Sequence, residues 1–203
     1  MVNFLFDVDG TLTPPRKSMV LDFKTYFKFW VRTQQSSGNK VYLVTGSDKD
    51  KTIEQVGEEI WKMVDGSYQN AGNQLFVNGE LIFESQWDMP EDLESVTLDL
   101  IRQSRWYGTA ENNIENRIGM VNISTIGRDC TDEQRSEYYE WDKDNLERET
   151  IANVINSNFE DIEAVIGGEI SIDIYPKGKD KSQILECLEG KNIFFGDNCY
   201  FGG

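Results

Sequence analysis

Two carboxylates near the start of the chain follow a short apolar run. Residues 4–13 read FLFDVDGTLT, so Asp7 comes directly after the run and Asp9 two positions later. Residues two apart in an extended or tightly turned segment point the same way, so both carboxylates are expected at one pocket, where a buried strand ends. Clustered carboxylates repel each other, and a divalent cation relieves that repulsion. One carboxylate can then attack phosphorus while the other transfers a proton.

Two structural alternatives explain the same residues. An EF-hand loop also begins with Asp-x-Asp, but it requires Gly at its sixth position and Glu at its twelfth, where this chain has Leu12 and Ser18. A plain turn also uses Asp and Gly, for positive φ and local hydrogen bonds. The full string after an apolar run favours the chemical interpretation over the turn.

Composition and charge exclude several classes of function. The 203 residues include 36 Asp and Glu against 20 Lys and Arg, a net charge of −16, which repels nucleic acids and anionic membranes. A phosphate substrate would be repelled as well, so its site must be locally basic or hold a metal. Histidine is absent, which excludes His-based nucleophiles and His-rich metal sites. We therefore expect neither a nucleic-acid nor a membrane partner.

Cysteine usage and hydropathy indicate the compartment. Cys130, Cys187 and Cys199 are too scattered for a zinc site or a disulfide framework, so we expect small core or near-core residues in a reducing cytosol. The start of the chain lacks the basic region of a signal peptide, and no apolar run approaches membrane-spanning length. These features predict a soluble, cytoplasmic protein.

Apolar periodicity predicts the elements that must position the two carboxylates. After the opening strand, apolar residues at three- and four-residue steps over 20–34 predict a helix, and residues 40–45 predict a second buried strand. Ser47, with Asp50 three residues later, is the expected N-cap of the next helix. This βαβα order predicts a parallel sheet with right-handed crossovers. Asn78-Gly79 between short apolar runs predicts a hairpin.

The pattern of elements changes between about residues 82 and 177. The expected elements there are, in order, a helix over 93–101, a strand over 120–126, a long charged helix from a Thr131 cap to about Phe159, and strands over 162–166 and 170–175. Short antiparallel strands backed by helices form an α+β insert. A helix over 181–188 and a strand over 192–195 resume the first pattern. We therefore predict an α/β core over 1–81 and 178–203, with an inserted α+β cap over 82–177.

Four motifs resemble those of the haloacid dehalogenase (HAD) superfamily of phosphotransferases. Residues 7–13 resemble the first motif, and residues 44–47 (VTGS) resemble the second. Lys181 resembles the lysine of the third motif, and Gly196-Asp197 resembles the acidic fourth motif. The resemblance implies a three-layer, Rossmann-like core with a parallel sheet and an inserted cap that holds an antiparallel sheet with helices.

The same resemblance implies roles for individual residues. Asp7 is the expected nucleophile, forming an aspartyl phosphate, and Asp9 the acid and base. Thr45 and Lys181 are expected to stabilise the charge on the transferring group. Mg²⁺ is the expected cofactor, held by Asp7, by Asp9 through its backbone carbonyl, and by Asp197.

The insert resembles the cap of the eukaryotic-type phosphomannomutases. Residues 116–128 are similar to two cap strands of that family, and residues 167–176 to a later strand where the family keeps a Ser and an Asp for the sugar. The resemblance therefore implies that Ser171 and Asp173 bind sugar. Arg117 and Arg128 bracket one strand in a chain poor in cations, so they are expected to clamp the non-reacting phosphate.

The implied activity is phosphoryl transfer on hexose phosphates, as a phosphomannomutase that converts mannose 6-phosphate to mannose 1-phosphate for GDP-mannose supply. A hexose 1,6-bisphosphate is the implied activator. A HAD sugar-phosphate phosphatase is the alternative, because only water exclusion by cap closure separates the two activities. The choice between mannose and glucose stays open. The resemblance also implies a homodimer through the cap, for which the apolar side of the helix over 93–101 is a plausible contact.

Two departures from the family pattern bear on these expectations. The family continues past the Gly-Gly that matches Gly202-Gly203 with an Asn-Asp pair, a strand and a helix, so the chain is expected to be truncated relative to the family. A catalytically inactive sugar-phosphate-binding protein is therefore a third hypothesis. A third cap arginine of the family, expected ahead of the Arg117 strand, has only Arg105 as a loosely aligned counterpart.

Overall fold

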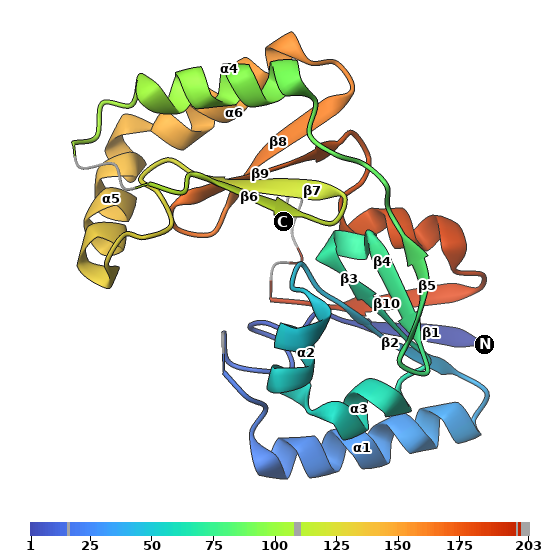
Figure 1. Ribbon diagram of the computed structural model, residues 1–203. Helices are drawn as coiled ribbons and strands as arrows, with labels where there is room; N and C mark the ends of the chain where they lie inside the picture. The colour runs from blue at the N-terminus through green and yellow to red at the C-terminus, as the bar shows by residue number, and fades with distance from the viewer. Residues whose placement is uncertain (16, 108–110, 198, 200–203) are drawn as a thin grey trace. The chain divides into compact units, whose positions relative to one another are not determined.

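The computed structural model describes residues 1–15, 17–107, 111–197 and 199, and it divides into two compact units (Figure 1). The first unit comprises Met1–Ser85 and Lys179–Gly203, and the second comprises Gln86–Gly178. Residue 82, the expected boundary, lies inside a strand that pairs within the first unit, so the chain leaves that unit only after this strand ends. Gly202-Gly203 lie outside the described residues.

The first unit is built on a six-stranded sheet with the order β10-β1-β2-β3-β4-β5. Its strands are β1 (Val2–Phe6), β2 (Lys40–Val44), β3 (Gly66–Gln69), β4 (Gln74–Val77), β5 (Glu80–Glu84) and β10 (Lys191–Phe195). The first three and β10 pair in parallel, whereas β4 and β5 are antiparallel. The parallel sheet that the sequence predicted is confirmed, with an antiparallel extension at one edge.

Helices cover both faces of this sheet. The helices α1 (Leu21–Ser36), α2 (Lys49–Val56) and α3 (Glu58–Met63) pack on one face, where Phe27, Val31 and Ile60 join the buried residues of β1 and β2. The 3₁₀ helix η2 (Lys181–Cys187) contributes Ile184 to a second buried cluster with Leu5 and Val44. The result is the three-layer arrangement expected from the motifs.

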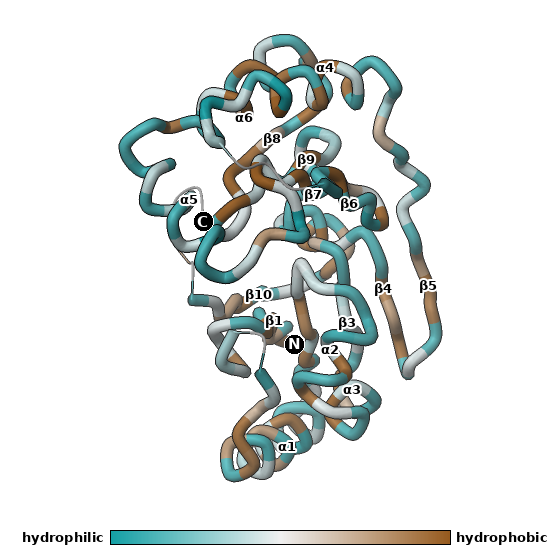
Figure 2. Tube along the Cα trace, turned by 60° about the vertical axis from the view of Figure 1, so that its left-hand side comes forward, coloured by the Kyte–Doolittle hydropathy of each residue, from teal (hydrophilic) through white to brown (hydrophobic). Residues whose placement is uncertain are grey.

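The hairpin between β4 and β5 follows the sequence prediction. Asn78 and Gly79 have φ values of 53° and 82°, the left-handed conformation that a tight hairpin turn needs at both positions. The buried face of α1 includes fewer residues than its apolar pattern predicted. Phe27 and Val31 are buried, whereas Tyr26 and Phe29 on other sides of the helix are exposed. Figure 2 shows both brown and teal segments along this helix.

The second unit contains a four-stranded antiparallel sheet with the order β6-β7-β9-β8. Its elements are α4 (Glu91–Arg102), β6 (Ile114–Arg117), β7 (Met120–Ser124), α5 (Asp132–Asn145), α6 (Glu147–Asn158), β8 (Ile162–Gly167) and β9 (Ser171–Pro176). Leu93 and Ile101 of α4 are buried with Ile155 of α6 against β7 and β9. Leu93 and Ile101 on the apolar side of α4 therefore pack on their own sheet, and the expected subunit contact near this helix stays a prediction.

The long charged helix predicted from Thr131 to Phe159 is wrong in one respect. Thr131 and Gln134 form the expected capping box, but the helix breaks at Leu146, which has a φ of 51°. The break buries the carboxylate of Glu147, which accepts hydrogen bonds from Ser104 Oγ at 2.9 Å and from Arg105 N at 2.8 Å. These partners come from a distant segment, so the local sequence carries no signal of the break.

Two further expectations concern the surface of the molecule. Within the described ranges, no helix is both long and apolar enough to cross a bilayer. All three cysteines are free, but Cys187 and Cys199 are exposed and only Cys130 is half-buried. The expectation of core or near-core cysteines is therefore wrong for Cys187 and Cys199, because η2 is a short surface helix and Cys199 lies in the segment after β10.

Candidate active site

Asp7 is held at the carboxyl end of β1. Its backbone N donates to the carbonyl of Phe195 (2.9 Å), which extends the pairing between β1 and β10 by one residue. Its Oδ1 accepts from the backbone N of Val8 (2.8 Å), and its Oδ2 lies 3.1 Å from Nζ of Lys181. The Asp7 side chain is 11% exposed and that of Lys181 is 38% exposed. A nearly buried carboxylate therefore faces the site with a single fixed orientation and a cation beside it.

A tight turn brings Asp9 to the same end of the sheet. The carbonyl of Val8 accepts from the backbone N of Leu12 and of Thr13, both at 3.0 Å. Gly10 has a φ of +77°, a left-handed conformation that other residues adopt only at a cost. The sequence DVDGT therefore forms a compact turn at the end of β1 that carries both Asp7 and Asp9. That the two carboxylates serve one site stays a prediction.

Three side chains hold the carboxylate of Asp9. Gln55 Nε2 donates to its Oδ1 (2.6 Å), while Ser47 Oγ and Lys51 Nζ lie 3.3 and 3.5 Å from its Oδ2. Lys51 and Gln55 are four residues apart and therefore share one face of α2. Neither was predicted as a site residue, because a Lys and a Gln in an ordinary polar helix carry no recognisable pattern.

The N-cap of α2 is Asp48 and not Ser47. The Asp48 side chain accepts from the backbone N of Lys51 (2.8 Å), so the predicted cap is wrong by one residue. Ser47 is thereby free to point its hydroxyl at Asp9, and its backbone N donates to Oγ1 of Thr45 (3.1 Å). Thr45 itself is 2% exposed and directly follows β2.

A loop with a left-handed backbone follows β3. It is hydrogen-bonded both to the residue after β2 and to η2, the helix that begins at Lys181. Asn70, Ala71 and Gly72 have φ values of 49°, 58° and 96° in succession. The backbone N of Ala71 donates to the carbonyl of Thr45 (2.9 Å), and the Ala71 carbonyl accepts from Gln183 Nε2 (2.9 Å). Through these two hydrogen bonds the loop connects Thr45 with the helix that carries Lys181. The sequence analysis did not identify this loop.

The third acidic residue, Asp197, follows β10. A methyl group on Gly10 would lie only 2.8 Å from Cγ of Asp197, so the carboxylate lies directly against the backbone after Asp9. Carboxylates and a backbone carbonyl are the oxygen donors that Mg²⁺ prefers, with water completing its shell. A set of Asp7, the Asp9 carbonyl and Asp197 includes only two metal-binding side chains. It is therefore compatible with the finding that no group of three acidic, Cys or His side chains suited to a metal occurs in the described part of the chain.

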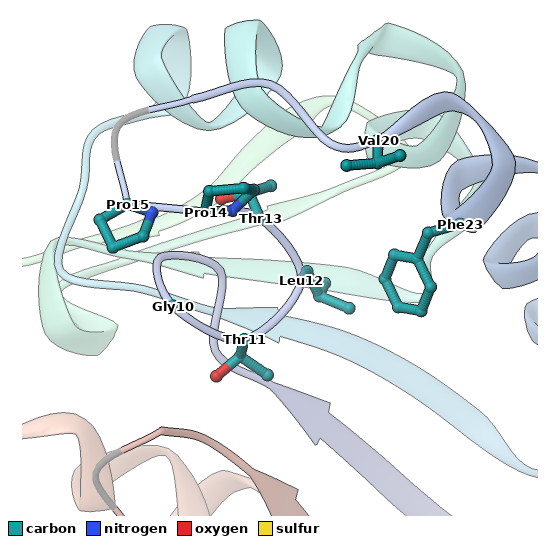
Figure 3. Close-up of a pocket in the computed structure, with 8 residues that line it drawn as sticks. All are labelled: Gly10, Thr11, Leu12, Thr13, Pro14, Pro15, Val20 and Phe23. Carbon is teal, nitrogen blue, oxygen red and sulfur yellow. The ribbon is translucent and has the colours of Figure 1, made fainter.

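A cavity of about 340 Å³ lies beside the turn that carries Asp9. Residues 10–15, Val20 and Phe23 line it, and Figure 3 shows Val20 and Phe23 on one side with the Thr11 hydroxyl turned away from them. Among the described residues that line it, none carries a charged side chain. Asp7 is not one of these lining residues.

In the second unit, the two predicted arginines meet at one carboxylate. Arg117 Nε and Nη2 donate to the two oxygens of Glu115 (2.8 and 3.2 Å), and Arg128 Nη1 lies 2.6 Å from Glu115 Oε2. Burial alone would raise the pKa of Glu115, but the hydrogen bonds and charges of both arginines together hold that pKa below its usual range. The structure thus brings Arg117 and Arg128 together and adds an acidic residue that the sequence did not identify.

The predicted sugar-binding residues lie on the same sheet. Strand register places Glu115 opposite Asn122, and Asn122 opposite Asp173. The Asn122 amide donates to Asp173, whose pKa is raised by burial against the opposing effects of Asn122, Arg117 and Arg128. Ser171 is a neighbour on β9, and its hydroxyl donates to the carbonyl of Gly167 (2.7 Å). Asp173 therefore faces the arginine pair, while Ser171 is engaged with the backbone.

Arg105 does not join this group. Its Nη2 donates to the carbonyl of Asn145 (3.0 Å), and its guanidinium lies 5.9 Å from the ring centroid of Trp141. These contacts place Arg105 at the end of α5. The structure therefore does not support Arg105 as the counterpart of the family's third cap arginine.

Comparisons with known proteins fit this geometry. The model of the family described as eukaryotic phosphomannomutase matches residues 29–203. A phosphomannomutase of Dendrobium officinale is 35% identical over 212 residues, covering 98% of this chain and 81% of that protein. One of Oryza sativa subsp. indica is 35% identical over 209 residues, with 98% and 82% covered. The chain belongs to the eukaryotic phosphomannomutase family.

The fold of this chain is similar to that of solved HAD structures. The HAD subclass IIB sugar phosphatase BT4131 aligns with a TM-score of 0.59 at 14% identity, covering 97% of this chain and 81% of that one. A Streptococcus mutans UA159 protein aligns with a TM-score of 0.64 at 13% identity, covering 96% and 80%. At such identities the likeness establishes the fold, and the family membership rests on the phosphomannomutase matches.

Proposed function

We propose that this chain is a phosphomannomutase that interconverts mannose 6-phosphate and mannose 1-phosphate through an aspartyl phosphate and supplies mannose 1-phosphate for GDP-mannose. The observation that supports this most directly is the buried carboxylate of Asp7, fixed at 3.1 Å from Lys181 at the end of β1. A nucleophile of this kind needs a fixed orientation and a nearby cation for the charge on the phosphoryl group. The phosphomannomutase relatives, which match nearly the whole chain, support the substrate class.

In this mechanism Asp7 attacks the phosphoryl group, and the leaving oxygen receives a proton from Asp9. Asp9 later takes a proton from the hydroxyl that accepts the phosphoryl group back from Asp7. The hydrogen bonds from Gln55 and Ser47 hold the Asp9 carboxylate beside the turn during these transfers. Lys181 and Thr45 stabilise charge on the transferring group, as positioned donors do in phosphoryl transfer.

Mg²⁺ fits the acidic edge of this site. Asp7, the backbone carbonyl of Asp9 and Asp197 would hold it, because the Asp197 carboxylate lies against the backbone of Gly10. When bound, the ion would neutralise negative charge on the phosphoryl oxygens and so reduce locally the repulsion between the acidic chain and a phosphate.

The second unit supplies the remaining binding groups in this proposal. Arg117 and Arg128 bind the phosphate that does not react, and Asp173 and Ser171 contact the sugar. A hexose 1,6-bisphosphate serves as activator, because it phosphorylates Asp7 without net consumption of substrate. The active form is a cytoplasmic homodimer, and light scattering that finds only monomer at working concentrations would contradict this part.

The test is to supply mannose 1-phosphate, Mg²⁺ and a hexose 1,6-bisphosphate, and to measure mannose 6-phosphate and inorganic phosphate in parallel. We expect isomerisation to exceed phosphate release. Phosphate release without isomerisation would identify a sugar-phosphate phosphatase. Binding of hexose phosphate without either product would identify an inactive binder.

Replacing Asp7 with Asn is the matching control. The amide is nearly isosteric but is not a nucleophile, so turnover should fall by at least about a thousandfold while hexose phosphate still binds. Residual turnover close to the wild-type rate would show that another group attacks phosphorus.

A further inference from the structure

The polar face of the sheet in the second unit carries two arginines and two carboxylates. Glu115 and Arg117 are two residues apart on β6, so they share one face of the sheet, and the register continues that face to Asn122 and Asp173. Arg128 comes from the loop after β7 and reaches Glu115 from outside the strand. The two positive charges are therefore already accompanied by negative ones when no ligand is bound.

Glu115 contacts different atoms in the two arginines. The edge of Arg117 formed by Nε and Nη2 is occupied, since both atoms donate to Glu115. Arg128 gives Glu115 only its terminal Nη1, at 2.6 Å. The Nε and Nη2 atoms of Arg128 are buried and have no hydrogen-bond partner in the part of the chain that the structure describes.

The unpartnered edge of Arg128 indicates a ligand. Leaving a buried donor unsatisfied destabilises the folded state, so two such donors on one guanidinium indicate an acceptor outside the described side chains. Nε and Nη2 point in parallel and match two oxygens of a phosphate or carboxylate in a bidentate contact. The acceptor expected there is an oxyanion.

We propose that Glu115 is a positioning residue that leaves the Nε–Nη2 edge of Arg128 for the non-reacting phosphate and leaves Arg117 only its terminal nitrogens. The identity of the oxyanion as a hexose phosphate rests on the proposed function. Glu115 holds the guanidinium of Arg128 by its Nη1, and the Nε–Nη2 edge binds the phosphate. Arg117 has its own Nε–Nη2 edge occupied by Glu115, so it contributes its charge and the N–H groups at the end of its guanidinium, with Nη2 shared between Glu115 and the phosphate.

A competing interpretation is that Glu115 imitates the phosphate and must be displaced by it. The contacts disfavour this, because Glu115 touches neither of the two Arg128 atoms that are unpartnered. A phosphate bound to these two atoms would therefore leave the contact between Glu115 and Arg128 Nη1 intact. The two interpretations predict opposite effects when the charge of Glu115 is removed.

The first test compares lysine at the two arginine positions. Lysine keeps the charge but cannot form a bidentate contact. Arg128→Lys should raise the KM for mannose 1-phosphate and the Kd for glucose 6-phosphate about ten- to a hundredfold, whereas Arg117→Lys should raise both less than about fivefold. The kcat should change little in either variant. Equal losses in the two variants would overturn the assignment.

The second test removes the charge of Glu115. Glu115→Gln releases both guanidinium groups, so the Kd for glucose 6-phosphate should rise about fivefold, and the Arg128→Lys and Arg117→Lys effects should become more alike in this background. Glu115→Asp should restore part of the asymmetry. A lower Kd in Glu115→Gln would overturn the positioning role and identify Glu115 as a competitor of the phosphate.

Controls separate this inference from folding and from the proposed function. Arg102→Lys alters an exposed ion pair with Asp99 in the same unit and should change neither binding nor turnover. Melting temperatures of all variants report folding. Calorimetric binding of glucose 6-phosphate needs no turnover, so the asymmetry can hold in a protein that fails to isomerise mannose 1-phosphate, which would overturn only the proposed function. Wild-type protein that isomerises but shows no asymmetry between the variants would overturn only the inference.

Discussion

Gln55 lies on the same face of α2 as Lys51, and both contact the carboxylate of Asp9. The Gln55 amide donates to that carboxylate at 2.6 Å. The same amide nitrogen lies 3.3 Å from Oγ1 of Thr13. Gln55 therefore connects Asp9, the proposed acid–base residue, to the turn that carries it.

We expect Gln55→Ala to lower the kcat for isomerisation about tenfold with little change in KM. Asp9 would lose a short orienting hydrogen bond, and an acid–base group acts only within hydrogen-bond reach of the proton that it transfers. Steady-state kinetics with mannose 1-phosphate measures both parameters. A rise in KM at unchanged kcat would indicate that Gln55 binds substrate instead of positioning Asp9.

Residue types and spacing were enough to predict part of the site. Asp7, Asp9 and Lys181 occur in recognisable strings, and the structure places them together at the ends of neighbouring elements. Gln55 and Glu115 were missed because each is an ordinary polar residue in a helix or strand. Their importance comes from what lies opposite them in space, which a linear pattern does not encode.

At the scale of elements, the turn after β1 and the segment after β10 meet at Gly10. A side chain there would combine a φ of +77° with a clash against the Asp197 carboxylate. Because the carboxylate is the far end of a flexible side chain, we expect Gly10→Ala to displace Asp197 rather than to unfold the protein. The concentration of Mg²⁺ needed for half-maximal activity should rise about tenfold.

A magnesium titration of turnover, together with a thermal melt, checks this prediction. An unchanged magnesium requirement in a folded Gly10→Ala variant would remove Asp197 from the proposed ion site. Loss of folding at ordinary temperature would show instead that the turn tolerates no side chain at all.

The break between α5 and α6 offers a test of stability. Leu146 has a φ of 51° and is 51% exposed, so it adopts a left-handed conformation with little packing in return. That conformation costs a non-glycine residue roughly 1–2 kcal/mol. Glycine removes this cost, but it also gives the unfolded chain more conformational entropy, which offsets part of the gain in stability. We expect Leu146→Gly to stabilise the protein by about 0.5–1 kcal/mol. Chemical denaturation measures this, with Leu146→Ala as a control that should gain nothing.

Elements were predictable where their signals are local. The capping box at Thr131 and the turn at Asn78 depend on residues a few positions apart, and both were predicted. The division of the charged helix at Leu146 depends on Glu147 reaching Ser104 and Arg105. The N-cap was misplaced to Ser47 because serine and aspartate are equally good caps, and only the site decides which one is used.

At the scale of the whole molecule, the buried carboxylate of Asp173 links stability to pH. Burial raises its pKa in the folded protein, so above the unfolded carboxyl value of about 3.9 the folded state binds more protons than the unfolded state. Stability therefore falls as the pH rises through this window. The raised pKa of Asp173 therefore lowers stability above this window relative to low pH.

We expect Asp173→Asn to raise the melting temperature at pH 7. The gain should shrink towards zero as the pH falls below about 4, where the wild-type carboxyl is protonated in both states. Melting curves of the two proteins across this range provide the measurement. A difference that does not vary with pH would show that Asp173 affects stability through packing and not through its charge.

The pairing of β1 with β10 sets the order in which the molecule can be completed. Asn3 Nδ2 donates to the carbonyl of Glu189, 186 positions along the chain, and Lys181 reaches Asp7 over a comparable span. The second unit is one continuous segment with its own core, so during synthesis it can fold while the two flanking segments are still apart. Asp7 and Asp9 leave the ribosome early, but they can contact Lys181 and Asp197 only after β10 and the residues that follow it have been made. A newly made chain therefore acquires its arginine-bearing face first and its capacity for phosphoryl transfer last.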